Sequence, residues 1–322
     1  MNSRHGQGAE VAGKFELLAS NMGKVLQGKE EVVRQAATCM VCEGHLLVED
    51  VPGVGKTTLA RALAKSVQLA WNRIQFTPDL LPSDITGVSV FNQATSDFEF
   101  RPGPVFANIV LGDEINRASP KVQSALLEVM EERTVTTDTM SFPVPRPFMV
   151  VATQNPIDME GTYSLPEAQL DRFLMRISIG YPSADAESTM LKNEKDVASV
   201  DDLRPVMSEN DLLWLIDQVK LVAVAPAIER YIVGISEYTR NATQVRLGVS
   251  PRGSLALLRA ARATAASSGR EFVTPEDVKL VAMPVLEHRI LIHPEAELQG
   301  HGPEEVVRRA LLSVPVPRKT DV

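Results

Sequence analysis

The stretch EDVPGVGKTT, residues 49–58, decides the fold of this chain. It matches the phosphate-loop pattern G-x-x-x-x-G-K-[ST] at every fixed position except the first, where Asp50 replaces the glycine. The apolar run 45–49 before the loop predicts a strand, and Leu59 and Leu63 after it share one face of a predicted helix. Strand, glycine turn and helix therefore follow one another in the order that a phosphate-binding loop needs.

The residue types of the loop suit an anion. Gly53 and Gly55 let the backbone approach a phosphate closely, and the N–H groups of the turn and helix N-terminus surround it. Lys56 reaches the outer phosphates, and the hydroxyl of Thr57 holds Mg²⁺. Asp50 tolerates turn geometry, so the missing glycine does not exclude a nucleotide site, although a plain turn with a surface lysine is the alternative. The predicted nucleotide-binding residues here are Pro52, Gly53, Val54, Gly55, Lys56, Thr57 and Thr58.

Composition places the chain among ordinary globular proteins. Its 322 residues are enough for two domains, and 44% are apolar and 23% charged. The 33 basic and 41 acidic residues give a net charge of −8, which argues against broad nucleic-acid binding. The sequence shows no apolar run of membrane-spanning length, and its first residues lack a signal-peptide core. A cytoplasmic location is therefore expected.

The cysteines form one C-x-x-C pair, Cys39 and Cys42, with His45 nearby. A zinc site needs about four ligands, and the sequence has no second pair. Both cysteines fall in a helix-like stretch ahead of the first strand. We therefore expect buried structural thiols rather than a metal or redox site.

Strands and helices alternate after the loop. A helix is expected over 119–132, with Ser119 as its N-cap and Pro120 at its first position. This alternation predicts an α/β fold with a mostly parallel sheet covered on both faces and with ligands at the carboxyl ends of the strands. The further strands are expected over 71–76, 108–114, 148–155 and 173–181.

Two stretches interrupt this alternation. Residues 77–107 and 133–146 lack a helical period, and Val88/Val90 and Phe98/Phe100 alternate within the first of them. Each is expected to be a hairpin insert, with ordinary surface loops as the alternative.

Start signals for helices dominate the last third of the chain. Ser208 precedes Asp211 by three residues, Ser250 precedes a proline, and Thr274 opens a capping box. A small all-helical domain is therefore expected there. The predicted organisation is a disordered N-terminus over 1–12, a core over 13–182, a helix and linker over 183–207, a helical domain over 208–314 and a flexible tail over 315–322.

Polar residues follow two of the predicted strands. Asp113 and Glu114 end the strand at 108–114, where one carboxylate can hold the Mg²⁺ shell and the other can polarise a water. Asn155 ends the strand at 148–155 and is suited to orienting that water. A polar cap on a strand is the alternative for the two carboxylates.

Five ordered motifs carry a resemblance to a known family. EDVPGVGKTT, LGDEINRA, VATQNP, LPEAQLDRF and GVSPR occur in this order, within a resemblance that runs from about residue 26 to about residue 290. Together they resemble the MoxR family of AAA+ ATPases, in which the phosphate loop often lacks the first glycine of the pattern. The resemblance implies a P-loop AAA+ αβα sandwich with a mostly parallel sheet, followed by a small all-helical lid domain.

The resemblance also implies roles for single residues. Lys56 and Thr57 would be the Walker A pair, with Thr57 and Asp113 holding Mg²⁺ through water. Glu114 would be the catalytic base of Walker B, and Asn155 would be sensor 1. The arginines have alternatives that the sequence leaves open. Arg252, in GVSPR, would be sensor 2 and touch the γ-phosphate, or else a solvated lid residue. Arg172, in LPEAQLDRF, would be the arginine finger for a neighbouring subunit, or else pair with Asp171 or Glu167.

The function implied by the resemblance is that of a chaperone-like ATPase. It would hydrolyse MgATP at protomer interfaces of a homo-oligomeric ring, a hexamer, and remodel or mature a client protein beside a von Willebrand factor A-domain partner. The two inserts would line the central face of the ring. Other interpretations are a magnesium-chelatase-like ATPase subunit, a nucleic-acid motor and a nucleotide-dependent scaffold. No nucleic-acid partner is expected.

Overall fold

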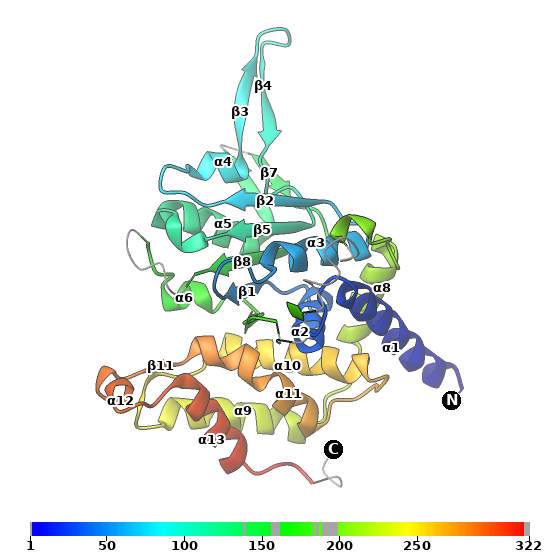
Figure 1. Ribbon diagram of the computed structural model, residues 1–322, viewed down its shortest axis with the longest axis vertical. Coiled ribbons are helices and arrows are strands. Elements are labelled where there is room, and N and C mark those ends of the chain that lie inside the picture. Colours follow the sequence, from blue (N-terminus) through cyan, green and yellow to red (C-terminus); the bar gives the residue numbers. More distant parts are fainter. Residues whose placement is uncertain are drawn as a thin grey trace.

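The computed structural model describes residues 2–137, 140–155, 162–182, 184, 187–188 and 199–318, with side chains from residue 7 onwards. Figure 1 shows a central sheet with a helical bundle below it and a long hairpin above it. The helix expected within 183–197 and residues 319–322 of the expected tail lie almost wholly outside the described residues.

The sheet has five parallel strands in the order β2-β5-β8-β1-β9. Each expected strand is present. Their bounds are β1 Leu46–Glu49, β2 Trp71–Gln75, β5 Ile109–Asp113, β8 Met149–Gln154 and β9 Met175–Ile177. Because the strands are parallel, the loops after β1, β5 and β8 all leave the sheet at the same carboxyl edge.

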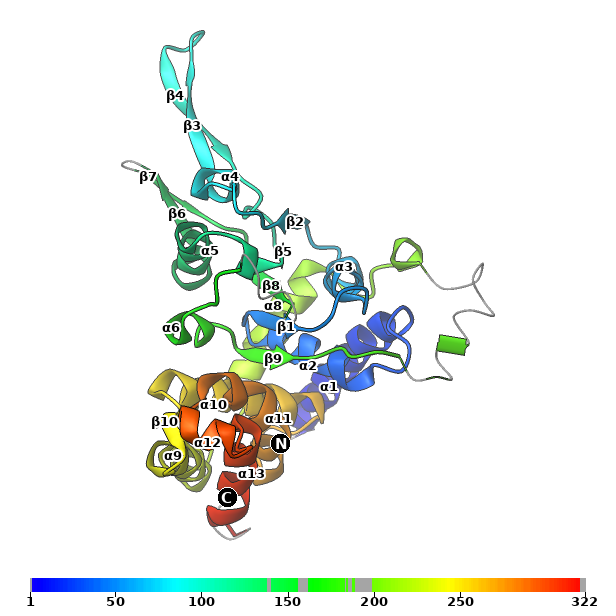
Figure 2. The same cartoon turned by 60° about the vertical axis from the view of Figure 1, so that its left-hand side comes forward.

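Alternate residues of the strands enter two separate hydrophobic clusters. Leu46 and Val48 face one cluster, whereas Leu47 faces the other. The first face is covered by α1 (Asn2–Gly23), α2 (Glu30–Val41) and α3 (Lys56–Ser66). The second is covered by α4 (Pro82–Thr86), α5 (Pro120–Glu132) and α6 (Glu167–Leu170). Figure 2 shows these two helical layers on either side of the sheet. The predicted αβα sandwich is confirmed.

Both expected inserts contain antiparallel hairpins. The first is formed by β3 (Gly87–Asn92) and β4 (Asp97–Pro102), and the second by β6 (Thr134–Thr137) and β7 (Met140–Pro143). The two lie side by side in Figures 1 and 2, and Phe100 stacks on Phe142 with ring centroids 4.2 Å apart. The β3–β4 hairpin projects well beyond the body of the molecule.

The C-terminal third is a helical bundle with a small two-stranded sheet. The start signals act as expected: Ser208 Oγ accepts from Asp211 N at 3.2 Å, and Thr274 N donates to Asp277 Oδ2 at 2.8 Å. The bundle consists of α8 Glu209–Lys220, α9 Pro226–Asn241, β10 Val245–Leu247, α10 Pro251–Ser267, α11 Pro275–Leu286, η3 Glu287–Arg289, β11 Leu291–Ile292, α12 Pro294–Leu298 and α13 Pro303–Ser313. Two further 3₁₀ helices precede it, η1 Ile115–Arg117 and η2 Val200–Asp202.

The N-terminus corrects one expectation. Residues 1–12 were expected to be disordered, but residues 2–23 form α1, which packs against α2, α3 and α10. The contact is close because Gly8 lies against Gly269, where an added Cβ would be 2.5 Å from the carbonyl oxygen. Buried Val11, Phe15 and Leu18 form an apolar stripe at helical spacing, and this stripe is the signal that predicts the helix.

Two other expectations concern burial and the membrane. Cys39 and Cys42 are free thiols in the interior, and burial raises the pKa of both. The expected burial of both thiols is confirmed. Among the described residues, no helix combines the length and apolar character needed to cross a membrane.

Glu43 ties α8 to the core. Its carboxylate is buried and accepts hydrogen bonds from Lys220 of α8 at 2.7 Å, from Arg146 at 2.8 Å and from Arg133 at 3.1 Å. Burial by itself raises the pKa of Glu43, but its bonds to Arg146 and Lys220 and the charge of Arg133 outweigh it and lower the pKa to about 2.

Glu43→Gln is expected to lower the free energy of unfolding by about 2 kcal/mol at pH 7, because three cations lose their shared carboxylate. The folded pKa lies below the unfolded value of about 4.3, so this contribution is present above that value and is lost as the pH falls towards 2. Urea titrations at pH 7, 5 and 3.5 measure it. Asp217→Asn, an exposed member of the same ion-pair network, serves as control. A difference that stays constant across the three pH values would contradict the assignment.

Candidate active site

The loop between β1 and α3 turns at two glycines with left-handed backbone. Gly53 has φ +85° and Gly55 has φ +101°, and no side chain caps the N-terminus of α3 at Gly55. Residues other than glycine rarely adopt these angles. The first N–H groups of α3 have no partners within the helix, which favours an anion at this point.

Lys56, the first residue of α3, lies between the ends of two neighbouring strands. Its Nζ donates to the backbone carbonyl of Asp50, after β1, and to that of Gln154, at the end of β8, at 3.1 Å. Burial lowers the pKa of Lys56, although the carboxylates of Asp50, Asp113 and Glu114 oppose the shift. The amine is thus held at the carboxyl edge by neutral oxygens, with three carboxylates near it.

Asp113 ends β5 beside Lys56. Its Oδ1 accepts from the hydroxyl of Thr153 at 2.7 Å, and its Oδ2 pairs with Arg73 of β2 at 2.5 Å. Thr153 is fully buried in β8, one strand away from Asp113. The carboxylate is therefore fixed from both neighbouring strands.

Glu114 leaves the strand in the left-handed region, with φ +59°. Its N–H donates to the hydroxyl of Thr153 at 2.9 Å, so one threonine orients both adjacent acids. Its Oε2 accepts from Gln75 at 3.0 Å and from Arg117 at 2.9 Å. A positive φ is uncommon in residues other than glycine, so the backbone leaves ordinary strand geometry at Glu114.

Asn155 follows Gln154, whose carbonyl accepts from Lys56. Four of the predicted site residues, Lys56, Asp113, Glu114 and Asn155, thus lie together at the carboxyl edge of the sheet. The predicted nucleotide-binding loop belongs to the same edge.

Arg172 lies at the opposite edge. It precedes Leu174, whose N–H donates to the carbonyl of His45 at 2.8 Å, where β9 and β1 both begin. The four residues of β1 separate this amino edge from Lys56 by roughly 13 Å. The guanidinium donates to the carbonyl of Leu127 at 2.5 Å.

Glu131 near the end of α5 holds both predicted arginines. Its Oε2 lies 3.0 Å from Nη2 of Arg172, and its Oε1 pairs with Nη2 of Arg252, at the start of α10. The side chains of these two arginines are 28% and 44% exposed. The structure thus places Arg252 beside Arg172 and away from the phosphate loop of its own chain. A pocket of about 280 Å³ adjoins this group.

Neither partner considered for Arg172 from the sequence forms the pair. Asp171 accepts from buried Arg289 at 2.7 Å and from Ser250 at 2.8 Å, and so joins the core to the helical bundle. Glu167 pairs with Arg246 at 3.3 Å.

Sequence reasoning missed Thr153 and Glu131. Thr153 lies inside the predicted strand and looks like any buried strand residue, so no local pattern marks it. Glu131 is one of several acids on α5, and only the fold distinguishes it from Glu128 and Glu132.

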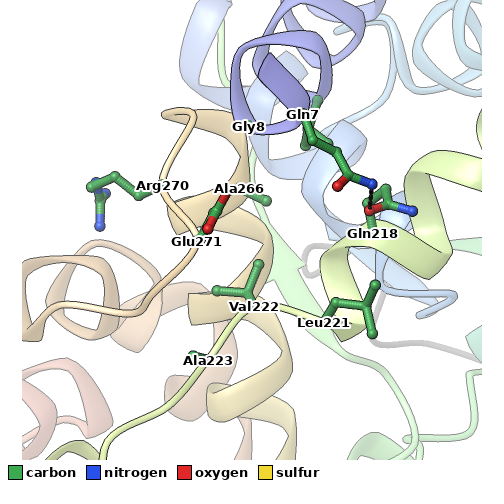
Figure 3. A pocket seen from close by; sticks show the side chains of 10 residues that line it. Gln7, Gly8, Gln218, Leu221, Val222, Ala223, Ala266, Arg270 and Glu271 are labelled. Atoms are coloured by element: carbon green, nitrogen blue, oxygen red, sulfur yellow. Dashed lines mark hydrogen bonds between the residues drawn. The ribbon is translucent and has the colours of Figure 1, made fainter. Parts of the chain in front are cut away.

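A separate hollow of about 450 Å³ lies between α1, α8 and α10. Figure 3 shows Gln7 and Gln218 hydrogen-bonded to each other on its wall, at 2.6 Å. It is lined mainly by neutral residues and contains none of the predicted site residues. The candidate active site is therefore not this hollow but the carboxyl edge of the sheet.

Comparisons with known proteins agree with this geometry. Residues 45–175 match the family "ATPase family associated with various cellular activities (AAA)", and residues 237–310 match the "AAA lid domain". The chain is 41% identical over 304 residues to "Chaperone MoxR1" of Mycobacterium tuberculosis, covering 92% of this chain and 80% of that one. The chain belongs to the MoxR family of AAA+ ATPases.

Further relatives cover almost the same length. "Protein MoxR" of Paracoccus denitrificans is 32% identical over 94% of this chain and 96% of its own, and the "Uncharacterized protein YeaC" of Bacillus subtilis is 49% identical over 92% and 93%. A crystal structure from Cytophaga hutchinsonii, of a protein provisionally described as an ATPase, superimposes with a TM-score of 0.90 at 36% identity, covering 98% of this chain and 99% of that chain. The helical bundle is thus the lid of a MoxR-type AAA+ fold.

Proposed function

We propose that the protein binds and hydrolyses MgATP at the interfaces between protomers of a ring and uses the reaction to remodel or mature a client protein. One observation carries the proposal: Lys56 and Glu114 lie at the carboxyl edge, whereas Arg172 and Arg252 converge on Glu131 at the amino edge. A single chain in this conformation cannot bring both sets to one phosphate group. A neighbouring protomer that offers its amino edge to the carboxyl edge can.

The loop residues fit a nucleoside triphosphate. The uncapped N-terminus of α3 and the two left-handed glycines would surround the phosphates, with Lys56 released from the carbonyls of Asp50 and Gln154 to contact them. A hydroxyl and a carboxylate, Thr57 and Asp113, are donors that suit Mg²⁺ and would hold it through water. The ion, when bound, would neutralise phosphate charge.

The remaining residues have separate roles. The carboxylate of Glu114 would take the proton from the attacking water, and Asn155 would orient that water. Arg172 of the next protomer would stabilise the charge that develops on the transferred phosphoryl group. Arg252 would contact the same phosphate, because Glu131 holds it next to Arg172. The inserts 77–107 and 133–146 would convey the conformational change that accompanies hydrolysis to the client.

The name of one relative indicates the class of client. A relative is named a chaperone, so we propose a protein client for this chain as well. A hexameric ring, a von Willebrand factor A-domain partner and a cytoplasmic location are parts of the same proposal that rest on the family resemblance.

The test is ATP turnover with Mg²⁺ over a wide range of protein concentrations, with size-exclusion chromatography beside it. Turnover per subunit that rises with concentration, in step with a ring-sized species, supports a shared site. Turnover that is flat across the range would overturn it. Added single-stranded DNA, or a porphyrin with chelatase subunits, distinguishes the nucleic-acid motor and the chelatase subunit, because either would be stimulated by its own substrate.

Glu131→Gln is expected to lower the protein concentration at half-maximal turnover about two- to fivefold, with kcat changed less than about twofold. The carboxylate competes with phosphate for both arginines, and exposed ion pairs of this kind contribute up to about 1 kcal/mol. Turnover against concentration measures the shift. Glu131→Asp keeps the charge, and Glu132→Gln changes the adjacent exposed acid, so both serve as controls. A higher half-maximal concentration in Glu131→Gln would contradict this role.

A further inference from the structure

Asp50 occupies the position where the phosphate-loop pattern has its first glycine. Its backbone φ is not in the left-handed region, so nothing in the turn requires glycine here. The side chain is 7% exposed, and its Oδ1 accepts from the N–H of Val51 at 2.8 Å. The residue is therefore a built part of the interior rather than a tolerated substitution.

The second oxygen of Asp50 reaches across to the chain after β9. Oδ2 accepts from the hydroxyl of Ser178 at 3.0 Å, from Ile179 N at 2.7 Å and from Gly180 N at 2.6 Å. Burial by itself raises the pKa of Asp50, but these bonds and that from Val51 outweigh it and lower the pKa. The carboxylate is thus held as an anion by the turn 178–181.

Lys29 binds the backbone carbonyls of the same turn. It directly precedes α2, and its Nζ donates to the carbonyls of Ile179 at 2.6 Å, Gly180 at 3.1 Å and Tyr181 at 2.8 Å. The turn 178–181 therefore gives its N–H groups to an acid and its carbonyls to a base. We call Asp50, Lys29 and residues 178–181 the clamp.

The clamp connects the turn after β9, the start of the phosphate loop and Lys56. β9 is the neighbour of β1, so the turn lies beside the start of the phosphate loop. The carbonyl of Asp50 accepts from Lys56, so this one residue contacts the catalytic lysine by its backbone and the turn by its side chain. A glycine at position 50 would keep the contact with Lys56 and lose the contact with the turn.

We propose that Asp50 and Lys29 are positioning residues for nucleotide binding, which fix the first half of the phosphate loop against the turn 178–181 so that Lys56 and the loop N–H groups are held ready for phosphate. This inference rests on the proposed function, because it needs the loop to bind ATP. Its consequence is that restoring the glycine of the usual pattern impairs the loop. Asp50→Gly removes the acceptor of three backbone N–H groups, those of Val51, Ile179 and Gly180, and lets the turn and the loop move independently.

The experiment is a titration of wild type and variants with a fluorescent ATP analogue and Mg²⁺, together with KM and kcat for ATP. Asp50→Gly is expected to weaken analogue binding and raise KM about tenfold, with kcat within about twofold. Lys29→Met disrupts the turn from its other side and is expected to act in the same direction. The double variant is expected to raise KM no more than about twice as far as Asp50→Gly alone, well below the product of the two single effects. The effects are not independent, because both residues hold the same turn.

Controls separate positioning from general destabilisation. Asp201→Asn removes another acid, which ties η2 to α3 through Arg61 and Lys65, and is expected to bind the analogue as wild type does. Asp50→Asn keeps one acceptor oxygen and is expected to fall between wild type and Asp50→Gly. Wild-type affinity in both Asp50→Gly and Lys29→Met would overturn the inference while leaving the ATPase proposal intact. No saturable binding by wild type would overturn both.

Discussion

Replacement of Glu114 by glutamine is expected to lower ATP turnover at least about a hundredfold, while MgATP affinity stays within about twofold of wild type. Glutamine keeps the shape of the side chain and its bond from Gln75, but it cannot take a proton from water. The left-handed backbone at Glu114 and the bond from its N–H to Thr153 do not involve the carboxylate and should persist. The loss should therefore fall on kcat alone.

Turnover and analogue binding measured side by side test this prediction. Glu128→Gln replaces an exposed acid of α5 that is not among the predicted site residues, so it is the matched control and should behave as wild type. Substantial turnover by Glu114→Gln would mean that another group activates the water. Loss of binding would instead assign Glu114 to the nucleotide pocket.

Arg172→Ala is expected to lower turnover about a thousandfold with MgATP affinity nearly unchanged, because the guanidinium would act only on the nucleotide of the next protomer. In the structure its Nη1 and Nη2 are bonded within the chain, to the carbonyl of Leu127 and to Glu131, at the edge away from Lys56. Arg172→Lys should recover little, since an ammonium lacks the planar fork that a phosphoryl group needs. Arg246→Ala, which breaks an exposed ion pair with Glu167, is the control.

Mixing the two inactive variants gives the decisive comparison. In a mixed ring, the intact loop and base of an Arg172→Ala protomer can meet the intact Arg172 of a Glu114→Gln protomer. About one interface in four is then complete, so an equimolar mixture should recover roughly a quarter of wild-type turnover. Neither variant alone should show it. A mixture as inactive as its components would mean that the site is not shared between chains.

Local sequence patterns predicted most of the fold. The five sheet strands and the helix at 119–132 follow from apolar periodicity. Ser208 and Thr274 mark helix starts through hydrogen bonds to residues only three positions away in the sequence. The loop glycines and Lys56 are likewise recognisable because a phosphate loop is contiguous in the chain. Motif order supplied the family, and with it the assignment of Arg172, which no local pattern would have produced.

The prediction that residues 1–12 are disordered was wrong. The apolar stripe of α1 is visible in the sequence, but only the tertiary structure shows that it is buried, where α1 packs against α2, α3 and α10. Helix formation near a chain end depends on such packing more than on intrinsic propensity.

The sequence by itself determined the layered α/β fold, the phosphate loop and the position of each acid at a strand end, because these depend on residues close together in the chain. Only the tertiary structure decided how the arginines and the clamp are arranged. The acid at position 50 bonds to a serine 128 residues away, and Glu131 pairs with an arginine 121 residues away. Such contacts arise when parallel strands bring distant segments to one edge of the sheet, and no periodicity of the chain encodes which side chains then meet.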